Sequence, residues 1–279
     1  MIEESHMTNE RKIKRADEGG QNSRAHPYPG DLRVYGDAGQ LARAAAELFV
    51  NTAADSIEAR GRFRVALSGG TTPRRLYKLL ATSAFSSRVD WDRIGIFWGD
   101  ERCVPADDPE SNYRMTAEAL LQHVPIPSTN VCRVPTEINP PRAAAAAYEH
   151  EIRHCFKAFD SVPQFDLIYL GLGTNGHTAS LFPRSPALKE TSRLVLADFV
   201  AEVNTWRITM SKSLLNRGRT VAFLVSGQEK AEVLREVLLG PHDPARLPAQ
   251  LIAPEGALLW MVDEAVAGLL SPLEERRSA

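Results

Sequence analysis

The sequence predicts an α/β protein with a mostly parallel, doubly wound open sheet, helices on both faces and a single domain. From Asp31 onward, short apolar runs of strand length alternate with longer helical segments. Several runs, such as residues 167–170, are apolar at every position, which is typical of strands buried on both faces. Three of the runs end in polar, glycine-rich sequence, where open α/β sheets place their ligands.

Capping and turn residues bound the elements in order. Asp37 can cap the first helix and Gly61 can end it, while Pro73 suits the first turn of a helix that runs to Leu80. Further helices are expected at 113–122, 141–159 and 228–239. The expected strands are 32–35, 63–67, 94–98, 131–134, 167–170, 194–197, 207–210, 220–225 and 257–262.

Neither an internal repeat nor a convincing linker divides the 279 residues, so we expect one domain over residues 31–279. Residues 1–30 are polar and include Gly19-Gly20, which predicts a disordered tail. A tag or a mis-assigned start is the alternative interpretation. The net charge of −2 indicates no nucleic-acid or membrane partner. The sequence has no apolar run near the ~18 residues of a membrane span. Residues 1–30 also lack the apolar core of a signal peptide.

The three cysteines, Cys103, Cys132 and Cys155, are odd in number and far apart in the sequence. Because no C-x-x-C pair is present, neither a zinc ribbon nor a disulfide framework is indicated. Free cysteines fit a reducing compartment best, so we expect the protein in the cytoplasm.

The loop after the second expected strand looks suited to an anion. Successive backbone N–H groups, hydroxyls and the N-terminal end of the following helix would face the ligand. The spacing and the lysine of a nucleotide P-loop are missing, which favours a single phosphate. A plain glycine turn is the alternative. The residues concerned are Ser68, Gly69, Gly70, Thr71 and Thr72.

Two further strand ends carry polar residues. Asp100-Glu101-Arg102 follows the strand at 94–98, and a solvated turn is its alternative interpretation. Gly171, Gly173 and Gly176 follow the strand at 167–170, with His177 directly after them. Glycines permit close backbone approach and a histidine takes up protons near neutral pH, so a site is favoured over a structural histidine. In a parallel sheet the three loops share one edge, where we expect them to converge.

His150-Glu151-Ile152-Arg153-His154 matches the H-E-x-x-H pattern of zinc proteases. Both histidines would share one helix face. The apolar stripe of that helix comprises Tyr148, Ile152, Cys155, Phe156 and Phe159. We therefore expect the histidines on the solvated face without a third ligand, and we do not favour a metalloprotease.

Three segments, in order, resemble the 6-phosphogluconolactonase family. They are Leu-Ser-Gly-Gly-Thr-Thr-Pro at 67–73, Trp-Gly-Asp-Glu-Arg-Cys-Val-Pro at 98–105 with Ser-Asn at 111–112, and Gly-Leu-Gly-Thr-Asn-Gly-His-Thr-Ala-Ser-Leu-Phe-Pro at 171–183. The resemblance runs from residue 31 to residue 270. It implies a hydrolase of the pentose phosphate pathway that opens 6-phosphoglucono-δ-lactone to 6-phosphogluconate. It also implies no metal or organic cofactor, and a fold shared with glucosamine-6-phosphate isomerase/deaminase.

The resemblance also assigns expected roles to residues. His177 would act as general base on water. Asp100 would position ring hydroxyls or water, whereas the matching aspartate of the related deaminases handles protons on the sugar. The N–H groups near Gly173 and Gly176, or Arg102, would hold the oxyanion. Arg207 and Lys230 fall where the family carries basic residues near the sugar phosphate. The expected substrate-binding residues are Ser68, Gly69, Gly70, Thr71, Thr72, Arg102, Gly173, Gly176, Arg207 and Lys230.

Asn175 departs from the family pattern, because many members carry aspartate at this position. An aspartate would orient the imidazole of His177 and stabilise its protonated form. Asparagine keeps a hydrogen bond through its carbonyl oxygen but supplies no charge. We therefore expect the pKa of His177 to be lower here than in an aspartate-bearing relative.

Two other functions stay open. A glucosamine-6-phosphate deaminase is less favoured, because residues 178–183 lack the glutamate-bearing loop of that enzyme. A non-catalytic sugar-phosphate sensor, of the kind found in transcription regulators with this fold, is also less favoured. His177 argues against a pure binding protein, and residues 1–30 are too few for a helix-turn-helix domain. A sugar-phosphate lactone is the expected small-molecule partner, bound by a monomer or a small homo-oligomer.

Overall fold

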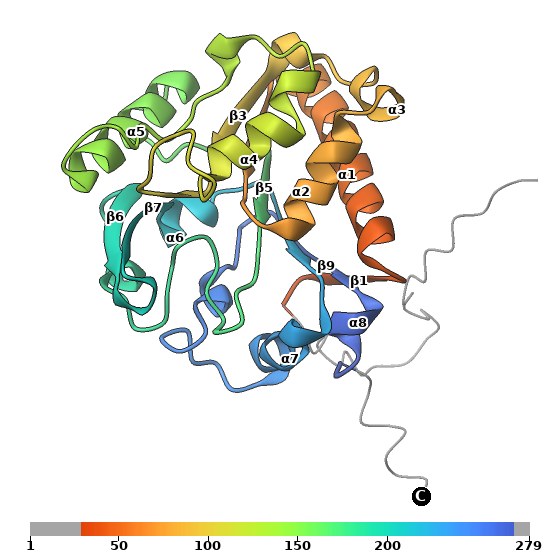
Figure 1. Ribbon diagram of the computed structural model, residues 1–279, viewed down its shortest axis with the longest axis vertical. Coiled ribbons are helices and arrows are strands. Elements are labelled where there is room, and N and C mark those ends of the chain that lie inside the picture. Colours follow the sequence, from red (N-terminus) through yellow and green to blue (C-terminus); the bar gives the residue numbers. More distant parts are fainter. Residues whose placement is uncertain (1–28, 271–279) are drawn as a thin grey trace, which may run out of the picture.

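The computed structural model describes residues 29–270, which are built on a six-stranded sheet in the order β1-β9-β8-β5-β2-β3 (Figure 1). All neighbouring strands in it run parallel, which confirms the predicted sheet. The strands are β1 (Asp31–Tyr35), β2 (Phe63–Leu67), β3 (Ile94–Trp98), β5 (Leu167–Leu170), β8 (Thr220–Val225) and β9 (Ala257–Asp263). Residues 1–28, most of the expected tail, lie outside the described residues.

Local capping explains where the first helix begins and ends. The Asp37 side chain accepts hydrogen bonds from the backbone N–H groups of Gly39 and Gln40 at 2.7 and 2.8 Å. Gly61 ends the helix in the left-handed conformation, at φ 76°. The helices are α1 (Ala38–Arg60), α2 (Thr71–Leu80), α3 (Ser83–Ser86), α4 (Asn112–Ala119), α5 (Pro141–Phe156), α6 (Lys212–Leu215), α7 (Ala231–Leu239) and α8 (Glu264–Ala267).

Helices cover both faces of the sheet, as predicted. Phe97 of β3 pairs in register with Ala66, three residues after Phe63 in β2. Since successive strand residues point to opposite faces, Phe63 and Phe97 lie on different faces. Phe49 of α1 packs on Phe63 with ring centroids 5.1 Å apart, whereas Phe156 of α5 packs on Phe97 at 5.6 Å. Helix α1 therefore covers one face and α5 the other.

The other three strands form a separate antiparallel sheet, in the order β4-β7-β6, that the sequence did not indicate. They are β4 (Asp100–Arg102), β6 (Val195–Val200) and β7 (Thr205–Met210), and α5 lies against β6 and β7 (Figure 1). The chain leaves the main sheet at Gly99. Its N–H donates to the Leu67 carbonyl at 2.9 Å, and its carbonyl accepts from the Met210 N–H at 2.8 Å. Strand β4 is too short to show the alternation of apolar and polar residues from which a strand is predicted.

Several predicted bounds were wrong. The segment 131–134 is not a strand, because only Val131 forms an isolated bridge, with Ile96. Helix α5 ends three residues early, since Lys157 adopts the left-handed conformation at φ 53°. Phe159, placed in the apolar stripe, is 57% exposed. Helix α4 is followed by a separate 3-10 turn (Leu121–His123), and α7 is preceded by another, η6 (Gln228–Lys230).

No helix within residues 29–270 is long and apolar enough to cross a membrane.

Candidate active site

The loops that follow β2, β3, β5 and β8 meet at a pocket of about 400 Å³ at the carboxyl ends of the strands, a volume suited to a small ligand. The expected convergence is thus present in the structure. Of the predicted site residues, Ser68 and Gly176 do not line the pocket. The ones that line it are Gly69, Gly70, Thr71, Thr72, Asp100, Arg102, Gly173, Asn175, His177, Arg207 and Lys230.

The loop after β2 brings the N-terminal end of α2 to the pocket. Gly70 precedes the helix with φ 110°, a conformation that favours glycine, and no described side chain caps the helix. A side chain at Gly69 would collide with Asn112, whose Oδ1 lies 1.9 Å from the position of an added Cβ. The first N–H groups of α2 therefore lie at the pocket without a side-chain acceptor, as an anion site requires.

Ser68, which was predicted to bind the substrate, does not line the pocket. It is buried, and its Oγ has no hydrogen-bond partner among the described residues. Its backbone is held by Tyr77, whose hydroxyl accepts from the Ser68 N–H at 3.1 Å and donates to the Ser68 carbonyl at 2.8 Å. Ser68 thus fixes the start of the loop behind the pocket.

Glu101 is buried and connects β4 to the start of α4. Its carboxylate accepts hydrogen bonds from the N–H groups of Arg102, Asn112 and Tyr113, each at 2.8 Å, and from Ser111 Oγ at 3.2 Å. Burial raises the pKa of this carboxyl, while the N–H donors oppose the rise. Glu101 therefore holds the segment that packs on the glycine loop.

Asp100 lines the pocket from β4. Its Oδ2 accepts a hydrogen bond from Ser180 Oγ at 2.6 Å, and its backbone carbonyl accepts from Asn112 Nδ2 at 3.0 Å. These contacts fix the carboxylate beside the loop that carries His177. The alternative interpretation of this segment as a solvated turn is wrong.

Two arginines on neighbouring strands give the pocket its positive charge. Arg102 of β4 and Arg207 of β7 are paired in register, and both line the pocket. Burial, followed by the charge of Arg102, lowers the pKa of Arg207, whose Nε is buried without a hydrogen-bond partner among the described residues. Like charges on directly opposed residues are unfavourable without a counterion. This pair therefore suits an anion.

Lys230 adds a third cation, from η6. Burial lowers its pKa, while the charges of Glu229 and Asp263 oppose that effect. The loop before it is held by Asp263, which accepts from the N–H of Gly227 at 3.3 Å and from the hydroxyl of Ser226. A fixed loop thus carries the ammonium group to the pocket.

His177 is half-buried and oriented by Asn175. Its Nδ1 lies 2.6 Å from Asn175 Oδ1, which also accepts from the His177 N–H at 3.2 Å. The amide Nδ2 of Asn175 donates to the two carboxylate oxygens of Glu202 at 3.1 and 3.0 Å. Because Oδ1 only accepts, Nδ1 carries the proton and Nε2 is the basic nitrogen of the neutral ring. Burial lowers the pKa of His177, while Asp100 and Glu202 oppose the shift.

The glycines of this turn have distinct geometric roles. An added Cβ at Gly173 would lie 2.1 Å from the His177 ring, so the imidazole rests directly on the glycine backbone. Gly176, at φ 82°, faces Leu247 instead. Phe182 stacks on the imidazole, with ring centroids 4.2 Å apart. The ring is therefore packed against both a glycine and an aromatic side chain.

Sequence reasoning missed Glu202 and assigned no role to Glu101 or Phe182. Glu202 lies in a 3-10 turn, η5 (Ala201–Val203), between β6 and β7, and no motif surrounds it. Only the antiparallel pairing of β7 with both β6 and β4 brings it to Asn175. Glu101 and Phe182 carry a weak signal, because both lie inside the segments that resemble the family.

The histidines of the H-E-x-x-H segment lie outside the pocket. His150 and His154 are exposed on α5, as expected.

Residues 36–260 match the family described as glucosamine-6-phosphate isomerases/6-phosphogluconolactonase. The chain belongs to this family. A 6-phosphogluconolactonase of Synechocystis is 42% identical over 218 residues, which span 78% of this chain and 88% of that protein. A human 6-phosphogluconolactonase is 38% identical over 259 residues, which span 91% and 99% of the two chains.

Solved structures of family members share the fold. The structure of 6-phosphogluconolactonase from Trypanosoma brucei matches with a TM-score of 0.76 and 30% identity, over 88% of this chain and all of that chain. A monomeric glucosamine-6-phosphate deaminase matches with a TM-score of 0.72 over 85% and 99% of the chains. At 19% identity, this second match shows a common fold alone.

Replacing Gly173 by alanine should displace the imidazole of His177, because the added Cβ would overlap the ring. A displaced ring loses part of its burial, so the pKa of His177 should rise toward its ordinary value of about 6.5. NMR titration of the histidine ring protons measures this shift. Gly171→Ala is the matched control, since no described atom lies within 4 Å of its added Cβ. A wild-type His177 pKa in Gly173→Ala would contradict the prediction.

Proposed function

We propose that this protein hydrolyses 6-phospho-D-glucono-1,5-lactone to 6-phospho-D-gluconate, with His177 as the general base. The observation that carries the proposal is His177, oriented by Asn175, in one pocket with three cationic side chains. Relatives that cover most of the chain are 6-phosphogluconolactonases, which supports the choice of substrate.

The chemistry begins with a water molecule beside His177. Nε2 takes a proton from the water as its oxygen attacks the lactone carbonyl carbon. The tetrahedral oxyanion then collapses and breaks the bond between the carbonyl carbon and the ring oxygen. Protonated His177 returns its proton to that oxygen, which becomes a hydroxyl. The lowered pKa of His177 supports this role, because the ring is then largely neutral at neutral pH.

The oxyanion needs a preorganised donor. The N–H of Gly173 donates to the His177 carbonyl, and that of Gly176 donates to the Gly173 carbonyl, both at 2.9 Å. Hydrogen bonds of the turn therefore occupy both groups, which speaks against the expectation that they bind the oxyanion. Arg102 lines the pocket, and only its Nη1 donates to the Glu110 carbonyl. Its other N–H groups can donate to a ligand, so we assign the binding of the oxyanion to Arg102.

The phosphate would bind between the N-terminal end of α2 and the cations of the pocket. The uncapped N–H groups at residues 71–72, Arg207 and Lys230 offer donors and positive charge. The unpartnered Nε of Arg207 supports this assignment. Binding energy from the phosphate, far from the reacting carbon, orients the lactone and can raise kcat. Asp100, fixed by Ser180, would position ring hydroxyls or the water.

Replacing His177 by alanine should lower kcat by roughly 10²–10⁴-fold, the usual contribution of a general base, with little change in KM. The assay follows 6-phosphogluconolactone, generated in situ, against its spontaneous hydrolysis. His154→Ala, on the exposed face of α5, is the control and should keep the wild-type rate. Near-wild-type turnover of His177→Ala would refute the assignment of the base. No acceleration by the wild-type protein would refute the proposed function.

Opposite changes of charge around His177 should shift the pH–rate profile in opposite directions. Asn175→Asp adds a negative charge beside Nδ1, which favours the imidazolium and raises the pKa of His177. Glu202→Gln removes a charge that raises this pKa, so the pKa should fall. Since the neutral ring is the base, the acid limb of kcat/KM should move to higher pH in Asn175→Asp and to lower pH in Glu202→Gln. A limb that stays in place in both variants would show that His177 does not control the rate.

Arg207→Met should raise KM for the phosphorylated lactone, by roughly tenfold or more if one charge-assisted contact of about 1.5–3 kcal/mol is lost. Hydrolysis of unphosphorylated glucono-1,5-lactone should change little, because that substrate carries no phosphate. Arg193→Met is the control, because the exposed Arg193 forms an ion pair with Glu190 and does not line the pocket. An equal loss with both substrates would place Arg207 at the reacting carbon instead.

A further inference from the structure

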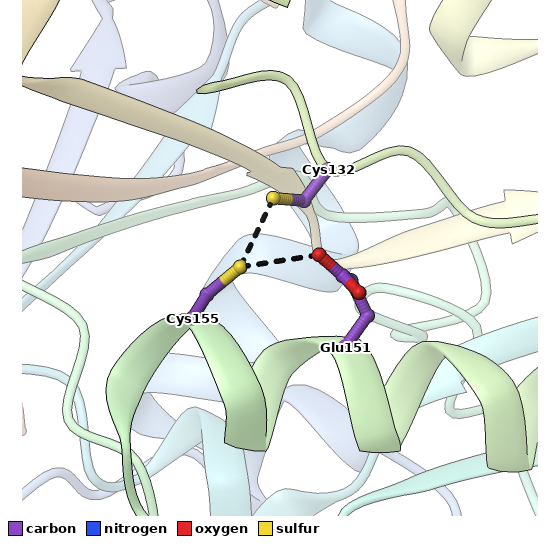
Figure 2. Close-up of side chains that lie close together, drawn as sticks. All are labelled: Cys132, Glu151 and Cys155. Carbon is purple, nitrogen blue, oxygen red and sulfur yellow. Dashed lines mark hydrogen bonds between the residues drawn. The ribbon is translucent and has the colours of Figure 1, made fainter. Parts of the chain in front are cut away.

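Two cysteines that are far apart in the sequence meet beside a carboxylate (Figure 2). None of the three residues lines the pocket. Cys132 Sγ lies 3.4 Å from Cys155 Sγ, and Cys155 Sγ lies 3.3 Å from Glu151 Oε1. The three potential ligand atoms lie within 4.8 Å of one another. Within residues 29–270, this is the one group of three or more His, Cys, Asp or Glu side chains with such spacing.

The backbone fixes all three side chains. Glu151 and Cys155 are four residues apart on α5, so they project from the same face on successive turns. Cys132 faces them from the segment beside β3, where its N–H donates to the Ile96 carbonyl at 2.9 Å. Figure 2 shows the three side chains pointing toward a common point between the helix and this segment. The ligand atoms are therefore brought together by a helix and by a segment that is hydrogen-bonded to β3.

The distances fit a tetrahedral ion. Zinc–sulfur bonds of about 2.3 Å in tetrahedral geometry place two sulfurs roughly 3.8 Å apart. The two sulfurs lie 3.4 Å apart, and small side-chain rotations would bring them to the separation that a zinc ion needs. The observed separation is much longer than the about 2.05 Å of a disulfide bond. Two sulfurs and a carboxylate oxygen are ligands that Zn²⁺ accepts.

The local charges also suit a cation. Thiolates at Cys132 and Cys155 would lie beside the Glu151 carboxylate, and a cation would offset the repulsion among the three negative charges. Two thiolates and one carboxylate around a divalent ion carry a net charge of −1. Arg64 donates through Nη2 to the Cys155 carbonyl at 3.1 Å, and its charge acts on both cysteines. The guanidinium group would balance the remaining charge.

We propose that Cys132, Glu151 and Cys155 form a binding site for one soft divalent cation of the Zn²⁺ type. Cys132 is buried, Cys155 is half-buried and Glu151 is exposed, so the ion would enter on the Glu151 side and keep a water there as fourth ligand. The site uses the glutamate of the H-E-x-x-H segment, whereas His150 and His154 are not among its ligands.

The bound ion would act on stability rather than on catalysis. It would join α5 to the segment beside β3. The same helix holds the end of β3 through Tyr148, whose hydroxyl accepts from the Trp98 N–H at 2.8 Å and donates to the Trp98 carbonyl at 3.0 Å. Because an ion bound only to the folded state stabilises it, Tm should rise with metal concentration.

Direct titration of the full chain with Cd²⁺ and Zn²⁺ tests the site. The protein is first stripped with a chelator and kept reduced with a phosphine. Cd²⁺ should give an ultraviolet thiolate-to-metal charge-transfer band that saturates at one ion per chain. Zn²⁺ should displace Cd²⁺, raise Tm and release thiol protons, which calorimetry in buffers of different ionisation enthalpy measures.

Matched variants distinguish the proposed ligands from other side chains. Cys132→Ser and Cys155→Ser should each abolish saturable binding, and Glu151→Gln should weaken it by roughly tenfold or more. Cys103→Ser removes the third cysteine, which lies outside the cluster, and should bind like wild type. The double variant His150→Ala/His154→Ala should also bind like wild type. Unchanged far-ultraviolet circular dichroism shows that each variant is folded.

Three results would overturn the proposal. The first is the absence of a saturable charge-transfer band in the reduced wild-type protein. The second is binding that survives Cys132→Ser but is lost in the histidine double variant, which would assign the ion to the H-E-x-x-H face. The third is a protein whose Cys132 and Cys155 bind no metal when reduced and form a disulfide when oxidised by hydrogen peroxide. The two thiols would then be a redox pair.

Discussion

The site depends on one constraint of the main sheet, namely that all its strands run in the same direction. The carboxyl ends of β2, β3, β5 and β8 therefore lie along one edge, and the loops that follow them meet there. Residues separated by more than a hundred positions, such as Gly69 and His177, line the same pocket for this reason. The glycines at this edge then allow close approach, of Asn112 to Gly69 and of the His177 ring to Gly173.

The small antiparallel sheet adds what the parallel sheet does not supply. Strand β4 continues from β3 and pairs with β7, which places Arg207 beside Arg102. The turn between β6 and β7 carries Glu202 to Asn175. Within β4, the buried carboxylate of Glu101 binds three backbone N–H groups. A buried carboxylate with several donors fixes the segments around it, because any displacement leaves polar groups unpaired.

The environment of His177 separates orientation from charge. The amide of Asn175 determines which ring nitrogen of His177 carries the proton. The carboxylate of Glu202 contacts Asn175 rather than the imidazole, so its charge lies further from the ring. A charge at this greater distance raises the pKa of the imidazole less than one in direct contact. Together with burial, this arrangement favours a neutral base at neutral pH. The cluster of Cys132, Glu151 and Cys155 is separate from this site, because none of its residues lines the pocket.

The sequence by itself determined the main sheet and most of the pocket. Apolar runs defined β2, β3, β5 and β8 to the residue, because a strand buried on both faces needs continuous apolar sequence. Strand direction then placed three loops together. Only the tertiary structure decided the antiparallel sheet, the contact of Glu202 with Asn175 and the meeting of Cys132 with Cys155. Each of these joins distant segments through side chains or short strands, and such contacts leave no periodic pattern in a single sequence.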